Sequence, residues 1–102
     1  MRVVGKVVDE SGKPLAGLQV RAFDKDLIFD DKLGVTTTDA DGEFRIDYTE
    51  AQYTMVADDP DLYIRIFDAS GKKLLFTSEK AIRRSKNVEE HYDVTIPASK
   101  LA

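Results

Sequence analysis

Short runs in which hydrophobic and polar residues alternate recur along the 102 residues of this chain. Alternation with a period of two places the hydrophobic side chains on one face of an extended strand, whereas an amphipathic helix repeats them every three to four residues. In LQVRAFD, every second position from Leu18 to Ala22 is hydrophobic. The pattern predicts strands at residues 2–8, 18–24, 35–38, 43–48, 62–68, 74–78 and 91–97.

Glycine, proline, aspartate and serine separate these runs, as they do where a chain turns. The clearest turns are GKPLAG at residues 12–17, DADG at residues 39–42 and ASGKK at residues 69–73. Helical periodicity occurs only in residues 49–56 and 78–86. Short strands and turns at this spacing predict an all-β fold, an antiparallel β-sandwich.

The length of the chain suits one domain, which we expect to cover residues 1–97. Residues 98–102, ASKLA, are interpreted as a C-terminal tail, and a remnant of an expression vector is one source for it. No hydrophobic run reaches the length of about 18 residues that a transmembrane helix needs, and the N-terminus lacks the pattern of a signal peptide. Two locations stay open: the protein is cytoplasmic, or it is exported and its signal peptide is not part of this sequence.

The composition narrows the chemistry. Because the chain has no cysteine, disulfides, thiolate zinc sites and cysteine nucleophiles are excluded. The net charge of −4 argues against nucleic-acid binding, which usually shows a basic excess. The single histidine, His91, has no evident partners for a catalytic triad, and no glycine-rich phosphate loop is present. We therefore expect no enzyme activity.

An acidic stretch, FDKDLIFDDKLG, spans residues 23–34, and DDPD follows at residues 58–61. Calcium takes roughly six to eight oxygen ligands, mainly carboxylates and carbonyls from loops. If the two segments meet at one end of the sandwich, their carboxylates converge and calcium becomes a candidate cofactor. The candidate ligands, called the acidic set below, are Asp24, Asp26, Asp30, Asp31, Asp58, Asp59 and Asp61.

A structural role for these aspartates is the alternative, because aspartates also build turns by accepting hydrogen bonds from backbone amides. Asp39 and Asp41 in TDADG are expected to act in this way. The acidic stretch also lacks the spacing of an EF-hand loop. Both interpretations stay open at this point.

Three aromatic residues fall on the side of their strands opposite the predicted core. They are Phe23 in one run and Tyr63 and Phe67 in another. Outward aromatic side chains mark a contact surface, pair with each other across strands, or lie beneath a loop such as residues 49–60. Tyr63 and Phe67 are the candidate residues for binding a partner.

Longer motifs give the chain a resemblance to a known family. VVGKVVDESGKPLAGLQVRAFDKD is followed by DDKLG, TTTDADGEFRI and DDPDLYIRIFD, all within residues 3–77. This order resembles the transthyretin-like, or prealbumin-like, domains, nearest to the nematode transthyretin-like proteins and the bacterial carboxypeptidase regulatory-like domains. The resemblance implies a β-sandwich of seven to eight strands in two sheets. Nematode members usually carry disulfides, so the absence of cysteine favours a bacterial relative.

Fold alone does not decide function in this superfamily, which includes carriers, surface modules and enzyme appendages. We predict a non-catalytic binding or structural module that mediates interaction with a protein partner or a neighbouring domain. One alternative is a calcium-binding adhesion or membrane-contact module that uses the acidic set. Another is a self-associating, carrier-like unit that forms homo-oligomers.

Overall fold

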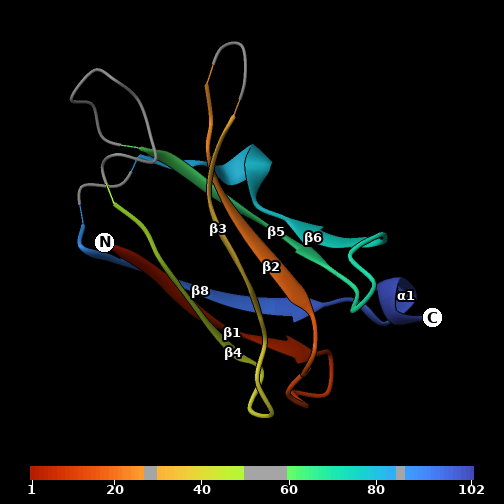
Figure 1. Cartoon of the computed structure of the whole chain (residues 1–102). Coiled ribbons are helices and arrows are strands. Elements are labelled where there is room, and N and C mark those ends of the chain that lie inside the picture. The colour runs from red at the N-terminus through yellow and green to blue at the C-terminus, as the bar shows by residue number, and fades with distance from the viewer. Residues whose placement is uncertain (27–29, 50–59, 85–86) are drawn as a thin grey trace.

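A computed structural model describes residues 1–26, 30–49, 60–84 and 87–102 of the chain. Strands make up most of these ranges, with one short 3-10 helix, η2, and one short C-terminal helix, α1 (Figure 1). The elements are β1 (Arg2–Asp9), β2 (Gln19–Asp24), β3 (Asp31–Thr37), β4 (Glu43–Asp47), β5 (Asp61–Phe67), β6 (Leu74–Thr77), η2 (Glu79–Ala81), β7 (Arg83–Arg84), β8 (Glu89–Ile96) and α1 (Ala98–Leu101).

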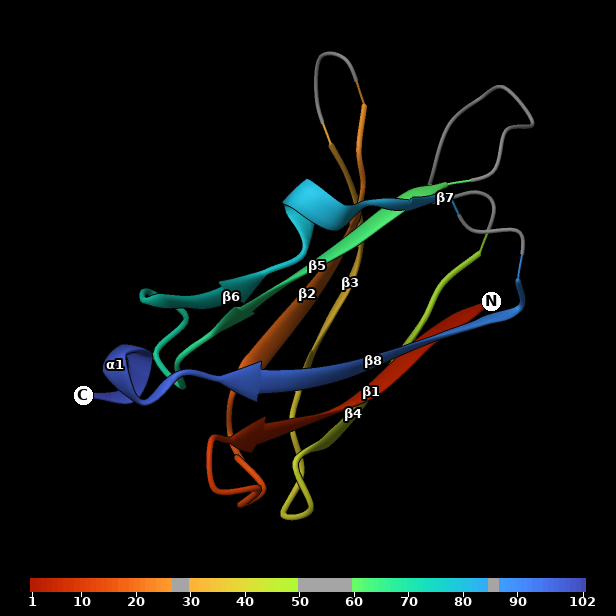
Figure 2. The same cartoon turned by 180° about the vertical axis from the view of Figure 1, so that it is seen from behind.

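Two sheets pack face to face, so the predicted all-β sandwich is confirmed (Figures 1 and 2). The smaller sheet has the strand order β4-β1-β8, and the larger has the order β3-β2-β5-β6, with β7 paired to the start of β5. In the described part of the chain, β1 and β8 pair in parallel and the other strand pairs are antiparallel. The N- and C-termini lie at opposite ends of the long axis.

The predicted inward faces form the core between the sheets. Alternate residues of β2, β4 and β8 are buried, because the pleat sends every second side chain to the same side. Each fully buried aliphatic or aromatic side chain stabilises the fold by about 1.5–3 kcal/mol relative to its exposed state. The core comprises Val3, Val7, Val20, Ala22, Leu33, Phe44, Ile46, Tyr48, Leu62, Ile64, Ile66, Leu75, Tyr92, Val94 and Ile96.

Three segments differ from the prediction. β3 begins at Asp31 rather than at residue 35, because its ladder with β2 continues past a β-bulge to the Asp24–Asp31 pair. The predicted helical stretch at 78–86 contains only η2 before Arg83 and Arg84 extend to pair with β5. The other predicted helical stretch, residues 49–56, falls outside the described residues except for its first.

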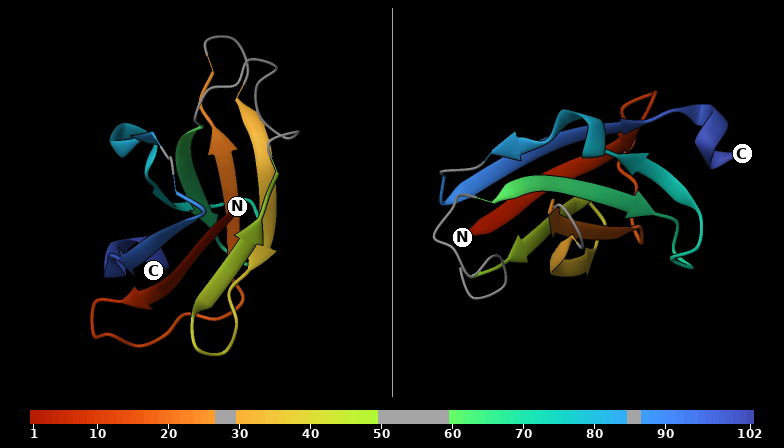
Figure 3. Two further views of the ribbon diagram at one scale, coloured as in Figure 1. Left: turned by 90° about the vertical axis from the view of Figure 1, so that its left-hand side faces the viewer. Right: turned by 90° about the horizontal axis from the view of Figure 1, so that it is seen from above.

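The two lateral edges of the sandwich are joined in different ways. On one edge the chain passes directly from β3 in the larger sheet to β4 in the smaller one through the turn at Asp39 (Figure 3). On the other edge Arg83 of β7 reaches β8, where its guanidinium lies 3.9 Å from the centre of the Tyr92 ring and donates to the His91 carbonyl oxygen at 2.6 Å. These links fix the sheets relative to each other.

The C-terminal tail packs against the domain. The backbone N–H of Ala98 donates to Oε1 of Glu10 at 2.7 Å, and Nζ of Lys73 donates to the Ala102 carbonyl oxygen at 3.3 Å. The short helix α1 therefore lies against the turns at the C-terminal end of the long axis. Among the described residues, no helix has the length and hydrophobicity that crossing a membrane requires.

Gly5 lets β1 lie close to the backbone of Tyr92 and to the ring of Phe44, which generates a prediction. A Cβ at this position would collide with the Tyr92 carbonyl oxygen and lie 2.7 Å from Cζ of Phe44. Gly5→Ala is therefore expected to destabilise the domain by about 3 kcal/mol, the upper end of the usual cost of overpacking, because a backbone oxygen cannot move aside as a flexible side chain can. Thermal unfolding would show this as a decrease in Tm of about 10 °C or more.

Gly12→Ala is the matched control, because no atom lies within 4 Å of a Cβ at that turn. Its φ of 85° adds only the cost of an alanine in the left-handed region, about 1 kcal/mol. Equal losses in the two variants would contradict close packing at Gly5.

Candidate binding face

The outer face of the smaller sheet carries charges of alternating sign. Strand pairing places Arg2 between Asp47 and Glu89, and Lys6 between Glu43 and Asp93. The Arg2 guanidinium lies 3.3 Å from the Glu89 carboxylate. Opposite charges thus lie on neighbouring strands and offset each other, so this face is typical of a solvated surface.

The outer face of the larger sheet is different, because aromatic and cationic side chains alternate on it. They come from β2, from the residue Lys25 just after β2, and from β5. We call this outer face the aromatic–cationic face. It is formed by Arg21, Phe23, Lys25, Tyr63, Arg65 and Phe67.

Contacts across the strands give this face its order. Phe23 and Tyr63 are paired in the ladder, and their rings are stacked with centres 5.0 Å apart and planes inclined by 17°. The Arg65 guanidinium lies 5.4 Å from both ring centres, and that of Arg21 lies 4.0 Å from the centre of the Phe67 ring. Such contacts are each worth about 0.5–1 kcal/mol at exposed positions, so together they hold the side chains in place.

Two carboxylates neutralise one end of the aromatic–cationic face. Glu79 of η2 accepts hydrogen bonds from Lys25, at 2.7 Å, and from Arg65. Asp30 accepts from the Tyr63 hydroxyl and lies 3.6 Å from Nζ of Lys25. The network therefore ties β2, β5, η2 and the residue preceding β3 together.

These contacts shift the pKa values of Glu79, Asp30 and Tyr63. Hydrogen bonds from Lys25 and Arg65 lower the pKa of Glu79. Burial opposes ionisation of Asp30, but the bonds from Tyr63, from the backbone N–H of Asp26 and from Lys25 outweigh it and lower the pKa of Asp30. Burial, and then the bond to Asp30, raise the pKa of Tyr63. At neutral pH both carboxylates are ionised and Tyr63 keeps its proton.

The aromatic residues are less exposed than their outward position suggests. Tyr63 is fully buried, with Phe23 stacked on its ring and the Arg65 guanidinium 5.4 Å from the ring centre. Phe67 is half-buried, beneath Arg21. Cross-strand pairing is thus the arrangement that the structure shows for Phe23 and Tyr63. A partner would meet the cations and the half-buried rings of Phe23 and Phe67, whereas Tyr63 is covered. The role of Tyr63 and Phe67 in binding stays a prediction.

The acidic set is only partly visible, since Asp58 and Asp59 lie outside the described residues. Asp24 is buried at the end of β2 and accepts a hydrogen bond from the backbone N–H of Asp61 at 2.7 Å. Burial raises the pKa of Asp24 in spite of this bond, and the negative charges of Asp31, Asp61 and Asp26 add to the effect. Asp26, Asp31 and Asp61 therefore lie near Asp24, whereas Asp30 turns to Tyr63.

Proximity of these carboxylates does not by itself form a cation-binding site. In the described ranges, the acidic group whose ligand atoms all lie within 4.8 Å of one another is Asp39, Asp41 and Glu43, at the turn before β4. Asp39 accepts hydrogen bonds there from the backbone N–H groups of Asp41 and Glu43, each at 2.9 Å. That turn matches the structural role expected for Asp39, and calcium binding by the acidic set stays a prediction.

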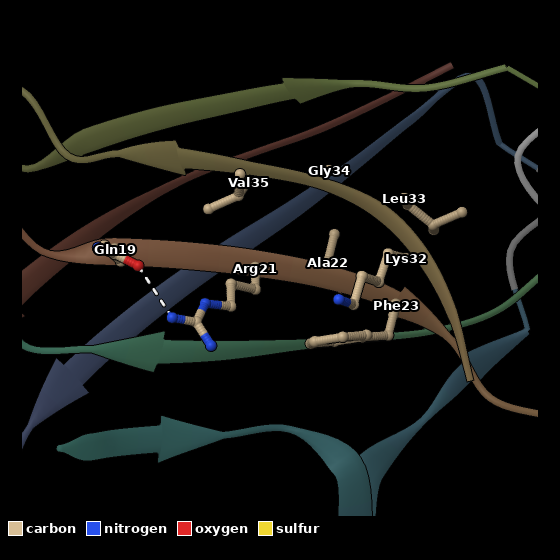
Figure 4. A pocket seen from close by; sticks show the side chains of 8 residues that line it. All are labelled: Gln19, Arg21, Ala22, Phe23, Lys32, Leu33, Gly34 and Val35. Atoms are coloured by element: carbon tan, nitrogen blue, oxygen red, sulfur yellow. Dashed lines mark hydrogen bonds between the residues drawn. The ribbon is translucent and has the colours of Figure 1, made fainter. Parts of the chain in front are cut away.

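A hollow of about 390 Å³ adjoins the aromatic–cationic face, and the sequence did not single it out. It lies over β2 and β3, where a β-bulge shifts the register between Ala22 and Phe23 (Figure 4). We call it the β2–β3 hollow. Its lining consists of Gln19, Arg21, Ala22, Phe23, Lys32, Leu33, Gly34 and Val35. The alternation of Arg21 and Phe23 in the sequence indicated that both side chains point outward from β2. The register that places Lys32 and Val35 of β3 beside them was not visible in the sequence.

The Tyr63–Asp30 hydrogen bond generates a prediction. Tyr63→Phe keeps the ring but removes the hydroxyl that donates to Asp30, and it is expected to cost about 1 kcal/mol at pH 7. Since the folded pKa of Asp30 is lowered, its contribution is complete above its unfolded pKa of about 3.9 and is lost as the pH falls through the folded value. Chemical unfolding from pH 7 to pH 3 should show the difference from the wild type shrinking.

Tyr92→Phe is the control, because in the described part of the chain the Tyr92 hydroxyl has no carboxylate within hydrogen-bond distance. Its effect on stability should change little over the same pH range. A Tyr63→Phe penalty that stays constant down to pH 3 would mean that Asp30 is not the partner that matters.

Comparisons with known proteins agree with this fold. The family model described as the carboxypeptidase regulatory-like domain matches residues 2–70, more than half of the chain. The crystal structure of a 9R-lipoxygenase from Cyanothece PCC8801 shares the fold, with a TM-score of 0.65 and 23% identity. The match covers 94% of this chain but only 16% of the lipoxygenase chain. No curated protein matches the chain.

Of the two nearest families that the sequence suggested, the regulatory-like one is matched and the nematode transthyretin-like one is not shown. The matched residues include β1 to β5 and hence the strands of the aromatic–cationic face. This chain belongs to the carboxypeptidase regulatory-like domain family.

Proposed function

We propose that this domain is a non-catalytic interaction module that binds a protein through the aromatic–cationic face and the adjoining β2–β3 hollow. The observation that carries the proposal is the contrast between the two outer faces. The smaller sheet balances its charges between neighbouring strands. The larger sheet gathers aromatic rings and guanidinium groups, with Val35 63% exposed beside them.

The side chains on this face are those that protein interfaces favour. Tyrosine, phenylalanine and arginine are enriched in interfaces, where rings supply area and guanidinium groups supply directed hydrogen bonds. The stacked rings and the cation–π contacts hold the side chains before a partner arrives. Order of this kind reduces the conformational entropy lost on binding.

Residues that favour catalysis are scarce. The single histidine, His91, is exposed on the smaller sheet, where Nε2 lies 3.0 Å from the Asp93 carboxylate. It thus lies on the opposite layer from the β2–β3 hollow. The family description, regulatory-like, also supports a module that does not itself catalyse a reaction. In the lipoxygenase the matched part is a minor portion of a larger chain, which supports an accessory role.

Selection from a library of random peptides, with the folded domain as bait, tests the proposal. We expect the selected peptides to lose binding by about tenfold or more when Val35 is changed to Glu, because that charge would stand at the centre of the contact. Val88→Glu is the matched control, since Val88 is 66% exposed and immediately precedes β8 of the other sheet. Peptides that bind both variants equally well would contradict the proposal.

Calcium binding by the acidic set is a second candidate, supported by the buried Asp24 and the carboxylates around it. We expect the Tm measured with calcium to be higher than the Tm measured in EDTA, and the Tm measured with magnesium to be unchanged. At a concentration one hundred times the Kd, a bound ion adds about 2.7 kcal/mol to stability. Asp24→Asn keeps an acceptor for the Asp61 N–H and should abolish the shift.

The same variant separates the two roles of the acidic set. Without calcium, Asp24→Asn should be slightly more stable than the wild type at pH 7, because it removes a charge whose pKa burial raises. No shift in Tm with calcium would leave the aspartates as builders of the loops. Self-association remains a third candidate, and the dependence of the molecular mass on protein concentration tests it.

A further inference from the structure

We infer that the β2–β3 hollow binds the carboxylate side chains of an acidic peptide segment in a partner protein. This inference rests on the proposed interaction function and specifies the chemistry of the partner. It starts from the charges that line the hollow: Arg21 and Lys32 are cationic, and none of the lining residues is acidic.

The two cations lack acidic partners. In the ranges that the structure describes, neither Arg21 nor Lys32 has a carboxylate oxygen within 4.0 Å. Their neighbours Lys25 and Arg65, in contrast, are neutralised by Asp30 and Glu79. Arg21 and Lys32 therefore leave uncompensated positive charge at the hollow.

Arg21 is also held in position. Its Nη2 atom donates to Oε1 of Gln19 at 3.0 Å (Figure 4). The same atom donates to the Gly71 carbonyl oxygen at 3.2 Å, and the guanidinium covers the Phe67 ring. Both bonds use the same nitrogen, so within the described residues Nη1 and Nε of Arg21 have no acceptor. A guanidinium that is held in place with free donors can give a charge-assisted hydrogen bond to a carboxylate from Nη1 or from Nε.

The remaining lining residues favour a peptide over a free small anion. Strand pairing sets the exposed Val35 beside Arg21, and Phe23 beside Lys32. Apolar surface thus alternates with positive charge across the hollow. A volume of about 390 Å³ is at the lower end for ligand sites and accommodates a few side chains rather than a folded domain. A segment that combines glutamate or aspartate with a hydrophobic residue meets both requirements.

Titration of the isotope-labelled domain with synthetic peptides, followed by NMR, tests this inference. The probe is acetyl-GEEFEEG-amide, and the controls are acetyl-GQQFQQG-amide and acetyl-GKKFKKG-amide. We expect the acidic peptide to shift the signals of residues 19–23 and 32–35 and to bind more weakly as salt increases. The glutamine and lysine peptides should bind at least about tenfold more weakly, since they lack the carboxylates.

Variants of the cations locate the site. Arg21→Gln and Lys32→Gln should each weaken binding of the acidic peptide about fivefold or more. Lys6→Gln is the matched control, because it removes the same charge from the outer face of the smaller sheet and should change the affinity less than about twofold. Lys32 is exposed, so its variant remains informative if Arg21→Gln perturbs folding.

The outcomes separate this inference from the proposal on which it rests. Equal binding of the glutamine peptide, signal shifts confined to other surfaces, or an equal loss in Lys6→Gln would each overturn recognition of carboxylates at the hollow. If the library selection still yields peptides that are sensitive to Val35→Glu, the interaction function stands and only the acidic partner is wrong. If no peptide is selected and the acidic peptide does not bind, both are wrong.

Discussion

The register in which β2 pairs with β5 determines both the core and the surface of the larger sheet. With Gln19 opposite Phe67 and Phe23 opposite Tyr63, residues such as Val20 and Ile64 point into the sandwich. The same register places aromatic and cationic side chains together on the outside. A shift by one residue would exchange the two faces and bury arginine. The hydrophobic core therefore fixes the geometry of the candidate binding face.

The charges on that face are divided unevenly. Asp30 and Glu79 lie outside β2 and β5 in the sequence. At one end of the face, both pair with Lys25, and Glu79 also pairs with Arg65. Arg21 is instead ordered by neutral groups, Gln19 and the Gly71 carbonyl, and so keeps its full charge beside the hollow. Since an exposed ion pair contributes little to stability, the difference bears more on what the surface can bind than on how stable the domain is.

The sequence predicted the sandwich well because alternation is a local signal of burial. The inward faces expected from Phe44 and Ile46, and from Val94 and Ile96, are all in the core. Strand ends were less predictable. The start of β3 at Asp31 depends on hydrogen bonds with β2, which local propensity does not reveal, and Gly34 and the aspartates disfavour a strand by propensity alone.

The candidate site was predictable only in part, because it is assembled from segments far apart in the chain. The outward position of Phe23, Tyr63 and Phe67 followed from alternation. The stacking that buries Tyr63, and the bulge that brings Lys32 beside Phe23, depend on the pairing of β2 with β5 and with β3. For the acidic set, the residue types were visible in the sequence, but the directions of the side chains were not. Asp30 turns to Tyr63, and Asp24 is buried.

A crystal structure of the domain with acetyl-GEEFEEG-amide would test the central claim most directly. The account predicts a glutamate carboxylate within hydrogen-bond distance of Nη1 or Nε of Arg21, with Nζ of Lys32 close to the same or a neighbouring carboxylate. The phenylalanine of the peptide should lie against Val35 or Phe23. A peptide bound elsewhere on the domain, with the β2–β3 hollow unoccupied, would contradict the account.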